Sequence, residues 1–377
     1  MSEALISGIG ITDFGRFPEL TDEALARAAI RDALADAGIV IDDVQAFYCG
    51  NATGGALAGQ RALRELHTDG GAVYNIDNAG ASGATALNLA LQALEAGQYD
   101  TAVVFGMDHT GSLAGGPPAS NPRDWNSCRG MTAAVLAAMR AMRYLHEHGV
   151  TAAALADVAV KNRRHGALNP IAKLCQLATR EEVLASRPVA EPLTSLQCGC
   201  AADGAAALVL TTMRGNGCAA PVRVLASVVQ SGLFDTGRVV MIEDEITLRA
   251  AHLAYEAAGL GPRDLDLIEL DDAFTISELL YCEALGLCGR GEAAGLLASG
   301  ATTLGGRVPV NASGGLLSTG QAVGAMGVAQ LVEICQQLQG RAGVRQVEGA
   351  RIGMTQVTAG GLCGVDNAAC AIHILSL

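Results

Sequence analysis

The sequence is poor in basic residues. Its 25 Lys and Arg are outnumbered by 38 Asp and Glu, which gives a formal net charge of −13 at pH 7. Binding to a phosphate backbone depends on clustered positive charge, so this balance excludes nucleic acid as an expected ligand. A local basic patch for a phosphorylated small molecule is still compatible with it.

Long apolar runs and a secretion pattern are also missing. No stretch approaches the roughly 20 consecutive apolar residues that span a bilayer, so no membrane segment is expected. The N-terminus lacks a basic region followed by an apolar core, and the 11 Cys lack the spacing of a disulfide framework. These absences favour a cytoplasmic protein. Cys198 and Cys200 stand too close together for a zinc knuckle, so no metal site is expected.

Aromatic residues are scarce, at 3% of the chain, whereas half of the residues are hydrophobic and 47 are Gly. This composition is typical of a compact α/β protein with many tight turns. The length of 377 residues is enough for two domains or one duplicated unit with a large core.

One segment of the chain is repeated much later. Residues 28–44 (AAIRDALADAGIVIDDV) align without a gap on residues 249–265 (RAAHLAYEAAGLGPRDL). In both segments a helical pattern ends at a Gly, Gly38 in the first and Gly259 in the second, 221 residues later (259 minus 38). The spacing predicts a duplication, and the alternation of strands with helices predicts parallel sheets covered on both faces.

A second echo involves a Gly-rich turn. Residues 75–98 (NIDNAGASGATALNLALQALEAGQ) run from this turn into a helical pattern, and residues 311–340 are similar. Such a turn directs backbone N–H groups and a helix dipole at one point, which suits a nucleophile or an anion. The tip of the first turn carries no Ser, Cys or Lys, because Gly80 stands there.

The two halves are expected at residues 1–215 and 216–377. Residues 112 to about 200 interrupt the pattern with a loop-like stretch, an amphipathic helix and a basic, turn-rich stretch. We interpret this region as an insertion that covers an active-site cleft, with a dimer interface as the alternative.

Six further segments share a family pattern. They are NAGASGATAL (78–87), VKNRRHGALNP (160–170), DGAAALVL (203–210), ELDDAFTISELLYCEALGL (269–287), VNASGGLLSTGQAVGAMG (310–327) and GGLCGVDNAACAIHIL (360–375). Together they resemble the thiolase superfamily, and more narrowly the sterol-carrier-protein-type thiolases and their relatives. The resemblance implies a duplicated five-layered α/β/α/β/α fold, with the insertion as an inserted loop domain, in a dimeric protein that handles coenzyme A thioesters.

The chain departs from this family at the positions that carry its chemistry. Family members carry a nucleophilic Cys where this chain has Gly80, so an acyl-enzyme cannot form there and thiolysis or Claisen condensation is not expected. Asp271 stands where the family pattern begins Asn-Glu-Ala-Phe or His-Asp-Cys-Phe, and Gln321 replaces the His of Gly-His-Pro. Cys363 falls approximately where thiolases place a second, basic Cys, without the glycines that follow it there.

The remaining groups are suited to stabilising a thioester enolate. We expect an oxyanion hole formed by backbone N–H groups near Gly80, by the Gln321 amide and by backbone donors near Gly360 and Gly361. Loss of one such donor typically lowers a rate by about 100-fold to 1000-fold, so a site that keeps several retains catalytic value.

Two residues are candidate acid–base groups. Asp271 is the first, because a carboxylate in an apolar cleft has a raised pKa and exchanges protons near neutrality; capping of a neighbouring loop is its alternative. Cys363 is the second, as a base or proton donor near the enolate carbon, with a buried neutral thiol as its alternative. We interpret Asp272 as a residue that braces the motif.

A short basic cluster stands out in the acidic chain. Lys161, Arg163 and Arg164 are consecutive or nearly so, and Arg recognises phosphate well, so we expect them to bind the phosphates of coenzyme A. A solvated helix end is the alternative. No cofactor is expected on this chain, and the coenzyme A thioester is expected as its substrate.

The family resemblance extends to a Cys-lacking branch, the steroid side-chain aldolases, which carry a Tyr where this chain has Asp271. It implies a Cys-independent carbon–carbon lyase of acyl-CoA metabolism, working by an aldol or retro-aldol reaction. It also implies a homodimer and a small partner protein with a zinc ribbon and an OB fold. The alternatives are a non-catalytic thiolase-like scaffold subunit and a subunit of a multi-subunit acyltransferase complex.

Overall fold

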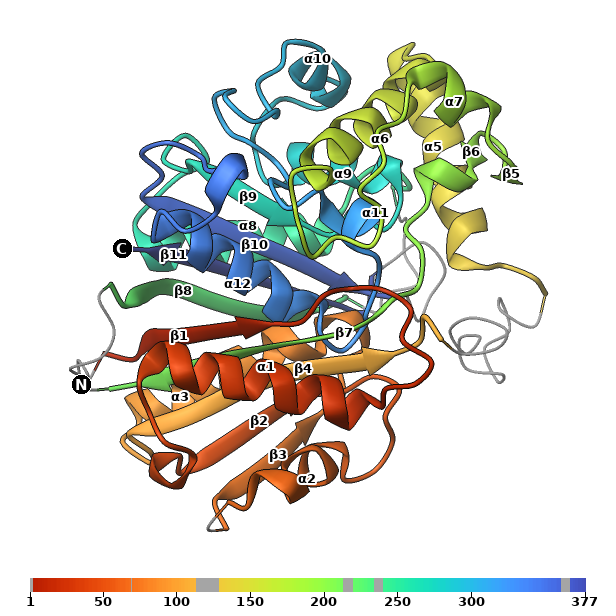
Figure 1. Cartoon of the computed structure of the whole chain (residues 1–377). Coiled ribbons are helices and arrows are strands. Elements are labelled where there is room, and N and C mark those ends of the chain that lie inside the picture. The colour runs from red at the N-terminus through yellow and green to blue at the C-terminus, as the bar shows by residue number, and fades with distance from the viewer. Residues whose placement is uncertain (1–2, 69, 113–128, 213–219, 234–239, 361–366) are drawn as a thin grey trace.

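The computed structural model describes residues 3–68, 70–112, 129–212, 220–233, 240–360 and 367–377. Nine strands form one twisted sheet across the molecule, with helices on both of its faces (Figure 1). These strands are β1 (Leu5–Ile11), β2 (Ala46–Gly50), β3 (Ala72–Ile76), β4 (Thr101–His109), β7 (Asp203–Thr211), β8 (Val222–Ser231), β9 (Leu267–Leu270), β10 (Ile352–Ala359) and β11 (Ala369–Ser376).

The helices fall into two groups. Those packed on the sheet are α1 (Asp22–Ala37), α2 (Ala58–Leu63), α3 (Ser82–Glu95), α8 (Glu245–Ala258), α9 (Thr275–Ala284) and α12 (Met326–Leu338). The others are α5 (Ala133–His148), α6 (Ala152–Gly166), α7 (Arg180–Ala185), α10 (Ala293–Ala298) and α11 (Gly315–Thr319), and a small hairpin is formed by β5 (Pro188–Ala190) and β6 (Leu193–Thr194). Within the described ranges, no helix has both the length and the apolarity needed to cross a membrane.

The strand order shows the duplication. It runs β3-β2-β4-β7-β1 and then β8-β11-β10-β9. Outward from the pair β1 and β8, the four strands of the second half repeat the first four of the first half, which β3 extends by one strand. The caps agree as well: α1 ends at Gly38 with φ 66° and ψ 29°, and α8 ends at Gly259 with φ 66° and ψ 30°. Glycine adopts this left-handed conformation without a steric penalty, which explains the shared residue.

The sheet is mixed, and the expectation of purely parallel sheets is therefore wrong. Strand β7 runs antiparallel to β4 and β1, and β11 runs antiparallel to β10 and β8. The reason for β7 is the path of the insertion. His109 at the end of β4 pairs with Asp203 at the start of β7, so the chain leaves and re-enters the sheet at the same end.

Alternate side chains of the strands enter different apolar layers. On β4, Val103 and Phe105 pack with α1 and α2, whereas Val104 packs with α3 and α12. On β9, Ile268 packs with α8 and α9, whereas Leu267 joins the core of α3 and α12. Helices α3 and α12 therefore lie between the two halves of the sheet, and the fold is the five-layered α/β/α/β/α arrangement.

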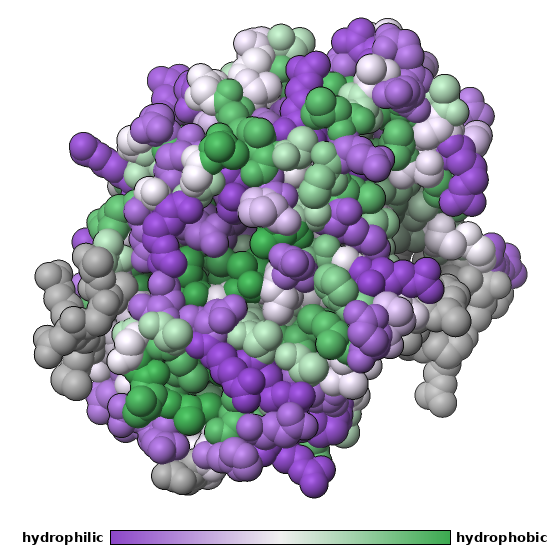
Figure 2. Space-filling view, viewed as in Figure 1, coloured by the Kyte–Doolittle hydropathy of each residue, from purple (hydrophilic) through white to green (hydrophobic). Residues whose placement is uncertain are grey.

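The insertion lies beside the C-terminal half. Helices α5 and α6, yellow and yellow-green in Figure 1, pack on the C-terminal half: α6 contacts α9 and α11, and α5 contacts α9. On the face seen in Figure 2, a hydrophilic band follows the outer side of α1, while hydrophobic and hydrophilic residues are interspersed elsewhere. Whether the insertion covers a cleft or forms a dimer interface stays a prediction, as does the boundary between residues 1–215 and 216–377.

Candidate functional site

The Gly-rich turn lies against the end of β10. A single 3-10 turn, Ala79–Ala81, leads into α3, and Ala79 has a φ of 46°, a left-handed conformation that costs a residue with a side chain about 1–2 kcal/mol. An ideal Cβ placed on Gly80 would lie 2.7 Å from the Thr358 carbonyl oxygen and 3.1 Å from Met326 Cε. The packing of β10 thus leaves no room for a side chain at Gly80.

Asp271 lies on the other side of the same threonine. Its Oδ2 accepts hydrogen bonds from Thr358 Oγ1 (3.0 Å) and Thr358 N (3.3 Å), and its Oδ1 accepts one from Ala273 N (3.2 Å). The residue is only 6% exposed, and burial raises the pKa of Asp271 above its usual range, against the lowering effect of the Thr358 hydrogen bonds. Asp271 and the turn at Gly80 therefore flank one residue, Thr358.

A chain of polar groups extends inward from this threonine. The Thr358 hydroxyl lies 3.0 Å from Tyr281 Oη, to which Asn367 Nδ2 donates (3.4 Å). Asn367 Nδ2 also donates to Asp244 Oδ2 (3.0 Å), which Arg140 Nη2 reaches at 3.1 Å. Sequence reasoning missed this network, because its members come from five separate segments and match no short motif.

Asp272 points away from the turn at Gly80. It is fully buried; its Oδ1 accepts from Leu316 N (2.5 Å) and its Oδ2 accepts from Asn162 Nδ2 (2.7 Å). Burial and the nearby Glu278 carboxylate raise the pKa of Asp272 to about 8. The residue ties the first turn of α11 to α6, which fits the bracing role predicted from the sequence.

A short segment, Cys198–Ala201, joins the motif after β9 to Gln321. Gly199 N donates to Ala273 O (2.8 Å), and Gln321 N donates to Cys200 O (2.7 Å). The side-chain amide of Gln321 lies against this segment, since its Nε2 is 2.6 Å from an ideal Cβ on Gly199. Gln321 is partly exposed.

The other predicted members of the site follow β10. Gly360 is exposed and comes directly after Ala359, whose Cα lies 3.9 Å from the ideal Cβ of Gly80. Ala368 N donates to Gly360 O (3.1 Å). Gly361 and Cys363 lie outside the described residues, and their roles as a backbone donor and an acid–base group stay predictions.

The three cations of the basic cluster point in different directions. Lys161 is buried, and its Nζ forms an ion pair with Glu278 (2.7 Å). Arg163 is buried, and the Cys200 thiol acts on its guanidinium electrostatically. Arg164 is exposed and lines a surface depression. Successive helical residues point about 100° apart, so neighbours in sequence need not share a face. Binding of coenzyme A phosphates by the three stays a prediction, with only Arg164 presenting an exposed charge.

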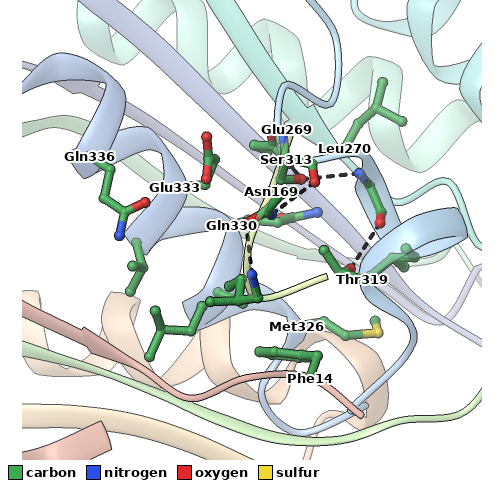
Figure 3. Close-up of a pocket in the computed structure, with 16 residues that line it drawn as sticks. Phe14, Asn169, Glu269, Leu270, Ser313, Thr319, Met326, Gln330, Glu333 and Gln336 are labelled. Carbon is green, nitrogen blue, oxygen red and sulfur yellow. Dashed lines mark hydrogen bonds between the residues drawn. The ribbon is translucent and has the colours of Figure 1, made fainter. Parts of the chain in front are cut away.

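A cavity of about 30 Å³, with mainly apolar walls and a few polar groups, lies between α12 and β9 (Figure 3). Glu269 accepts hydrogen bonds there from Ser313 N (3.0 Å) and Ser313 Oγ (2.5 Å). Burial and the Glu333 carboxylate raise the pKa of Glu269 to about 8. Gln330 Oε1 is buried without a hydrogen-bond partner among the described residues. A cavity of this size and polarity can hold a water molecule.

The raised pKa of Glu269 makes the stability of the fold depend on pH. The unfolded chain releases this proton near pH 4.5, whereas the folded protein keeps it up to about pH 8. The stability that protonated Glu269 contributes is thus complete below about pH 4.5 and is lost as the pH rises to about 8. Glu269→Gln, which mimics the protonated form, is expected to flatten the fall in melting temperature between pH 5 and pH 8, measured by calorimetry.

The control for this experiment is Glu348→Gln, at an exposed position. It should follow the pH dependence of the wild-type protein. Identical slopes for Glu269→Gln and the wild type would show that Glu269 is ionised in the folded protein at neutral pH.

The described part of the chain also bears on metal binding and on the contacts of other polar side chains. There, no group of three or more His, Cys, Asp or Glu side chains is arranged to hold a metal ion. His109 Nε2 lies 3.0 Å from Phe17 O, and Ser82 and Ser318 donate to Ala79 O and Asn162 O. These side chains are engaged in structural contacts.

Two protein-family models together match almost the whole chain. A family model described as "Thiolase, N-terminal domain" matches residues 5–214, and one described as "Thiolase C-terminal domain-like" matches residues 240–372.

Several characterised relatives match over most of their length. The chain is 41% identical over 364 residues to benzoylsuccinyl-CoA thiolase subunit BbsB of Thauera aromatica, covering 94% of each chain. It is 35% identical to an acetyl-CoA acetyltransferase of Methanothermobacter thermautotrophicus, covering 100% of each. It is also 35% identical to sterol carrier protein 2 of Gallus gallus, covering 92% of this chain and 68% of that protein.

Two solved structures have the same architecture. The Ltp2-ChsH2(DUF35) aldolase matches with a TM-score of 0.86 and 27% identity, covering 99% of this chain and 97% of that chain. Human mitochondrial 3-ketoacyl-CoA thiolase matches with a TM-score of 0.75, covering 100% and 98%. At 15% identity, the second match shows the fold alone.

Proposed function

Because this chain belongs to the thiolase family, we propose that it acts on a coenzyme A thioester, as a carbon–carbon lyase that needs no nucleophilic Cys. The observation that carries the proposal is the turn at Gly80, where the family's nucleophile position has neither a thiol nor room for one. The turn itself and a buried carboxylate, Asp271, are still present on either side of Thr358. Backbone donors and a base are sufficient for aldol chemistry, which forms no acyl-enzyme.

In the retro-aldol direction, the Asp271 carboxylate takes the proton from the β-hydroxyl of a β-hydroxyacyl-CoA. The bond between C2 and C3 breaks, C3 becomes a carbonyl carbon, and the electron pair passes into the thioester as an enolate. N–H groups at the Gly80 turn, the Gln321 amide and backbone donors at Gly360 stabilise the enolate oxygen. Return of the proton to C2 gives a shorter acyl-CoA, without free coenzyme A; Cys363 is the second candidate for this proton transfer.

The comparisons support the reaction class and a partner. The neighbour at 27% identity is an aldolase in complex with a DUF35 partner, and BbsB is a subunit. We therefore propose that this chain forms a homodimer and binds a small protein with a zinc ribbon and an OB fold. In the same proposal the chain itself binds no cofactor, and Arg164 contributes its exposed charge to the binding of coenzyme A.

A second candidate function is a non-catalytic subunit that supports an active thiolase or an acyltransferase complex. Two observations favour it: Gly80 replaces the nucleophilic Cys, and Gln321 replaces the His of the family motif. Another subunit would then carry the acyl group.

The experiment that tests these proposals uses the purified chain with any small protein that co-purifies. A panel of β-hydroxyacyl-CoA and β-ketoacyl-CoA esters is incubated with it, and the products are followed by mass spectrometry. Cleavage of a β-hydroxyacyl-CoA into a carbonyl compound and a shorter acyl-CoA supports the lyase. A covalent acyl group on Cys363 during turnover would refute it, and inactivity together with a tight complex to another enzyme subunit would favour the scaffold.

Restoring the thiol should not restore thiolase chemistry. In Gly80→Cys, the new Cβ would lie 2.7 Å from the Thr358 carbonyl oxygen, so β10 must shift. We expect a loss of about 1–3 kcal/mol in the free energy of unfolding, measured in urea, and no acyl-enzyme by intact mass after incubation with acetyl-CoA. Ala28→Cys, at an exposed position of α1, controls for an added thiol. A stable acyl-enzyme at wild-type stability would contradict the packing argument.

A further inference from the structure

One of the buried cations has no counter-charge. In the described part of the chain, four cationic side chains are buried: Arg140, Lys161, Arg163 and Arg345. Three form ion pairs with buried acids, in the pairs Arg140–Asp244 (3.1 Å), Lys161–Glu278 (2.7 Å) and Arg345–Glu333 (2.8 Å). Arg163 is 6% exposed, and no carboxylate of a described residue lies within ion-pair distance of it. A buried charge without a partner is unfavourable, so its presence needs an explanation.

The Arg163 guanidinium also has a donor that no described residue uses. Its Nε is buried and has no hydrogen-bond partner within the described ranges. Burial lowers the pKa of this guanidinium below its usual value, and the ionisable group that acts on it there is the Cys200 thiol. Arginine stays charged under such conditions, so the site holds a positive charge with free donor capacity.

The position of Arg163 ties it to the candidate functional site. Cys200, whose thiol acts electrostatically on the Arg163 guanidinium, accepts a hydrogen bond from Gln321 N through its carbonyl oxygen (2.7 Å). The helix of Arg163 packs directly on α11, the helix that leads to Gln321, and Ser318 Oγ donates to Asn162 O (3.0 Å). Helix α6, which carries Arg163, is therefore packed against the helix that leads directly to Gln321.

We propose that Arg163 binds a carboxylate on the acyl part of the substrate, so that the substrate class is coenzyme A thioesters carrying a second acidic group. The proposal rests on the proposed function, since it assumes that Gln321 marks the reaction centre. The planar guanidinium matches a carboxylate through two parallel hydrogen bonds. The phosphates of coenzyme A lie at the far end of the pantetheine arm from the thioester, and the enolate oxygen is stabilised by the turn at Gly80.

The test compares two thioesters with the same four-carbon acyl chain. Succinyl-CoA carries a terminal carboxylate and butyryl-CoA a methyl group, and their binding to the purified full-length chain is measured by titration calorimetry. The wild type should bind succinyl-CoA more tightly. Arg163→Gln should weaken succinyl-CoA binding by about tenfold to a hundredfold and leave butyryl-CoA binding unchanged within about twofold. Arg163→Lys should retain part of the preference, because it keeps the charge but not the planar fork.

Controls separate binding from folding and from catalysis. Arg143→Gln, at an exposed position of α5, should bind both thioesters as the wild type does. Arg163→Gln should keep or raise the melting temperature, because it removes an unpaired buried charge. Binding needs no turnover, so the preference can be present whether or not the lyase reaction is detected.

Three results would overturn the proposal. Equal weakening of both thioesters would assign Arg163 to the phosphates of coenzyme A, and unchanged binding of both would exclude it from ligand recognition. A lower melting temperature in both Arg163 variants, with loss of both ligands, would make the residue structural.

Discussion

Asp271→Asn is expected to lower the turnover of a cleaved β-hydroxyacyl-CoA by about 100-fold to 10,000-fold, the usual contribution of a positioned general base. The side chain is isosteric, and its amide can still form hydrogen bonds with Thr358, which contacts Asp271 through both N and Oγ1. The amide nitrogen then faces Ala273 N, which loses its acceptor, so a small fall in the melting temperature is expected. Turnover is measured by mass spectrometry of the shorter acyl-CoA at saturating substrate.

A matched exposed position provides the control, since Asp42→Asn should have wild-type turnover. Cys363→Ala distinguishes the two candidate bases. If Cys363→Ala abolishes turnover while Asp271→Asn retains it, the base is the thiol and the role of Asp271 is to hold the loop before α9. If both variants lose turnover, one of the two residues takes the proton from the β-hydroxyl oxygen and the other delivers a proton to C2.

The neighbouring carboxylate should give the opposite result. Asp272→Ala is expected to lower the free energy of unfolding by roughly 3 kcal/mol or more, because it leaves buried donors without acceptors. Leu316 N and Asn162 Nδ2 both donate to Asp272, at a site that is completely buried. Without this link, the connection of α11 to α6 depends on the hydrogen bond from Ser318 Oγ to Asn162 O and on side-chain packing. Urea unfolding followed by circular dichroism measures the change.

Asp42→Ala, at an exposed position, controls for the loss of a carboxylate and should change the free energy of unfolding by less than about 0.5 kcal/mol. A stable, folded Asp272→Ala that has lost only turnover would mean that Asp272 acts on the substrate. The pair Asp271 and Asp272 would then have exchanged the roles argued above.

Much of the architecture could be predicted from the sequence because it is encoded locally. The caps at Gly38 and Gly259 need a left-handed backbone, and this need keeps a Gly at the same place in both halves. The turn at Gly80 and the motif at Asp271 each follow a strand. The register of β9 on β10 brings Asp271 to Thr358, and packing of the turn on β10 brings Gly80 there. For these features, the arrangement predicted from local sequence patterns agrees with the structure.

The parts that could not be predicted depend on orientation and on distant contacts. Adjacency in sequence suggested a single patch of Lys161, Arg163 and Arg164, but helical rotation separates their side chains, and only Arg164 is exposed. The direction of β7 depends on where a long insertion re-enters the sheet, which no local pattern encodes. The polar network from Thr358 to Arg140 joins residues far apart along the chain.

The short contact between β1 and β8 has a consequence for cooperativity. The two halves of the sheet are joined there by only two residue pairs, Leu5 with Arg223 and Ile6 with Val222. Cohesion comes instead from α3 and α12, each of which packs on strands of both halves. Helix α3 of the first half and helix α12 of the second half are each buried partly by strands of the other half. Each half therefore excludes water from the helix of the other. We therefore expect the two halves to unfold together in one cooperative transition.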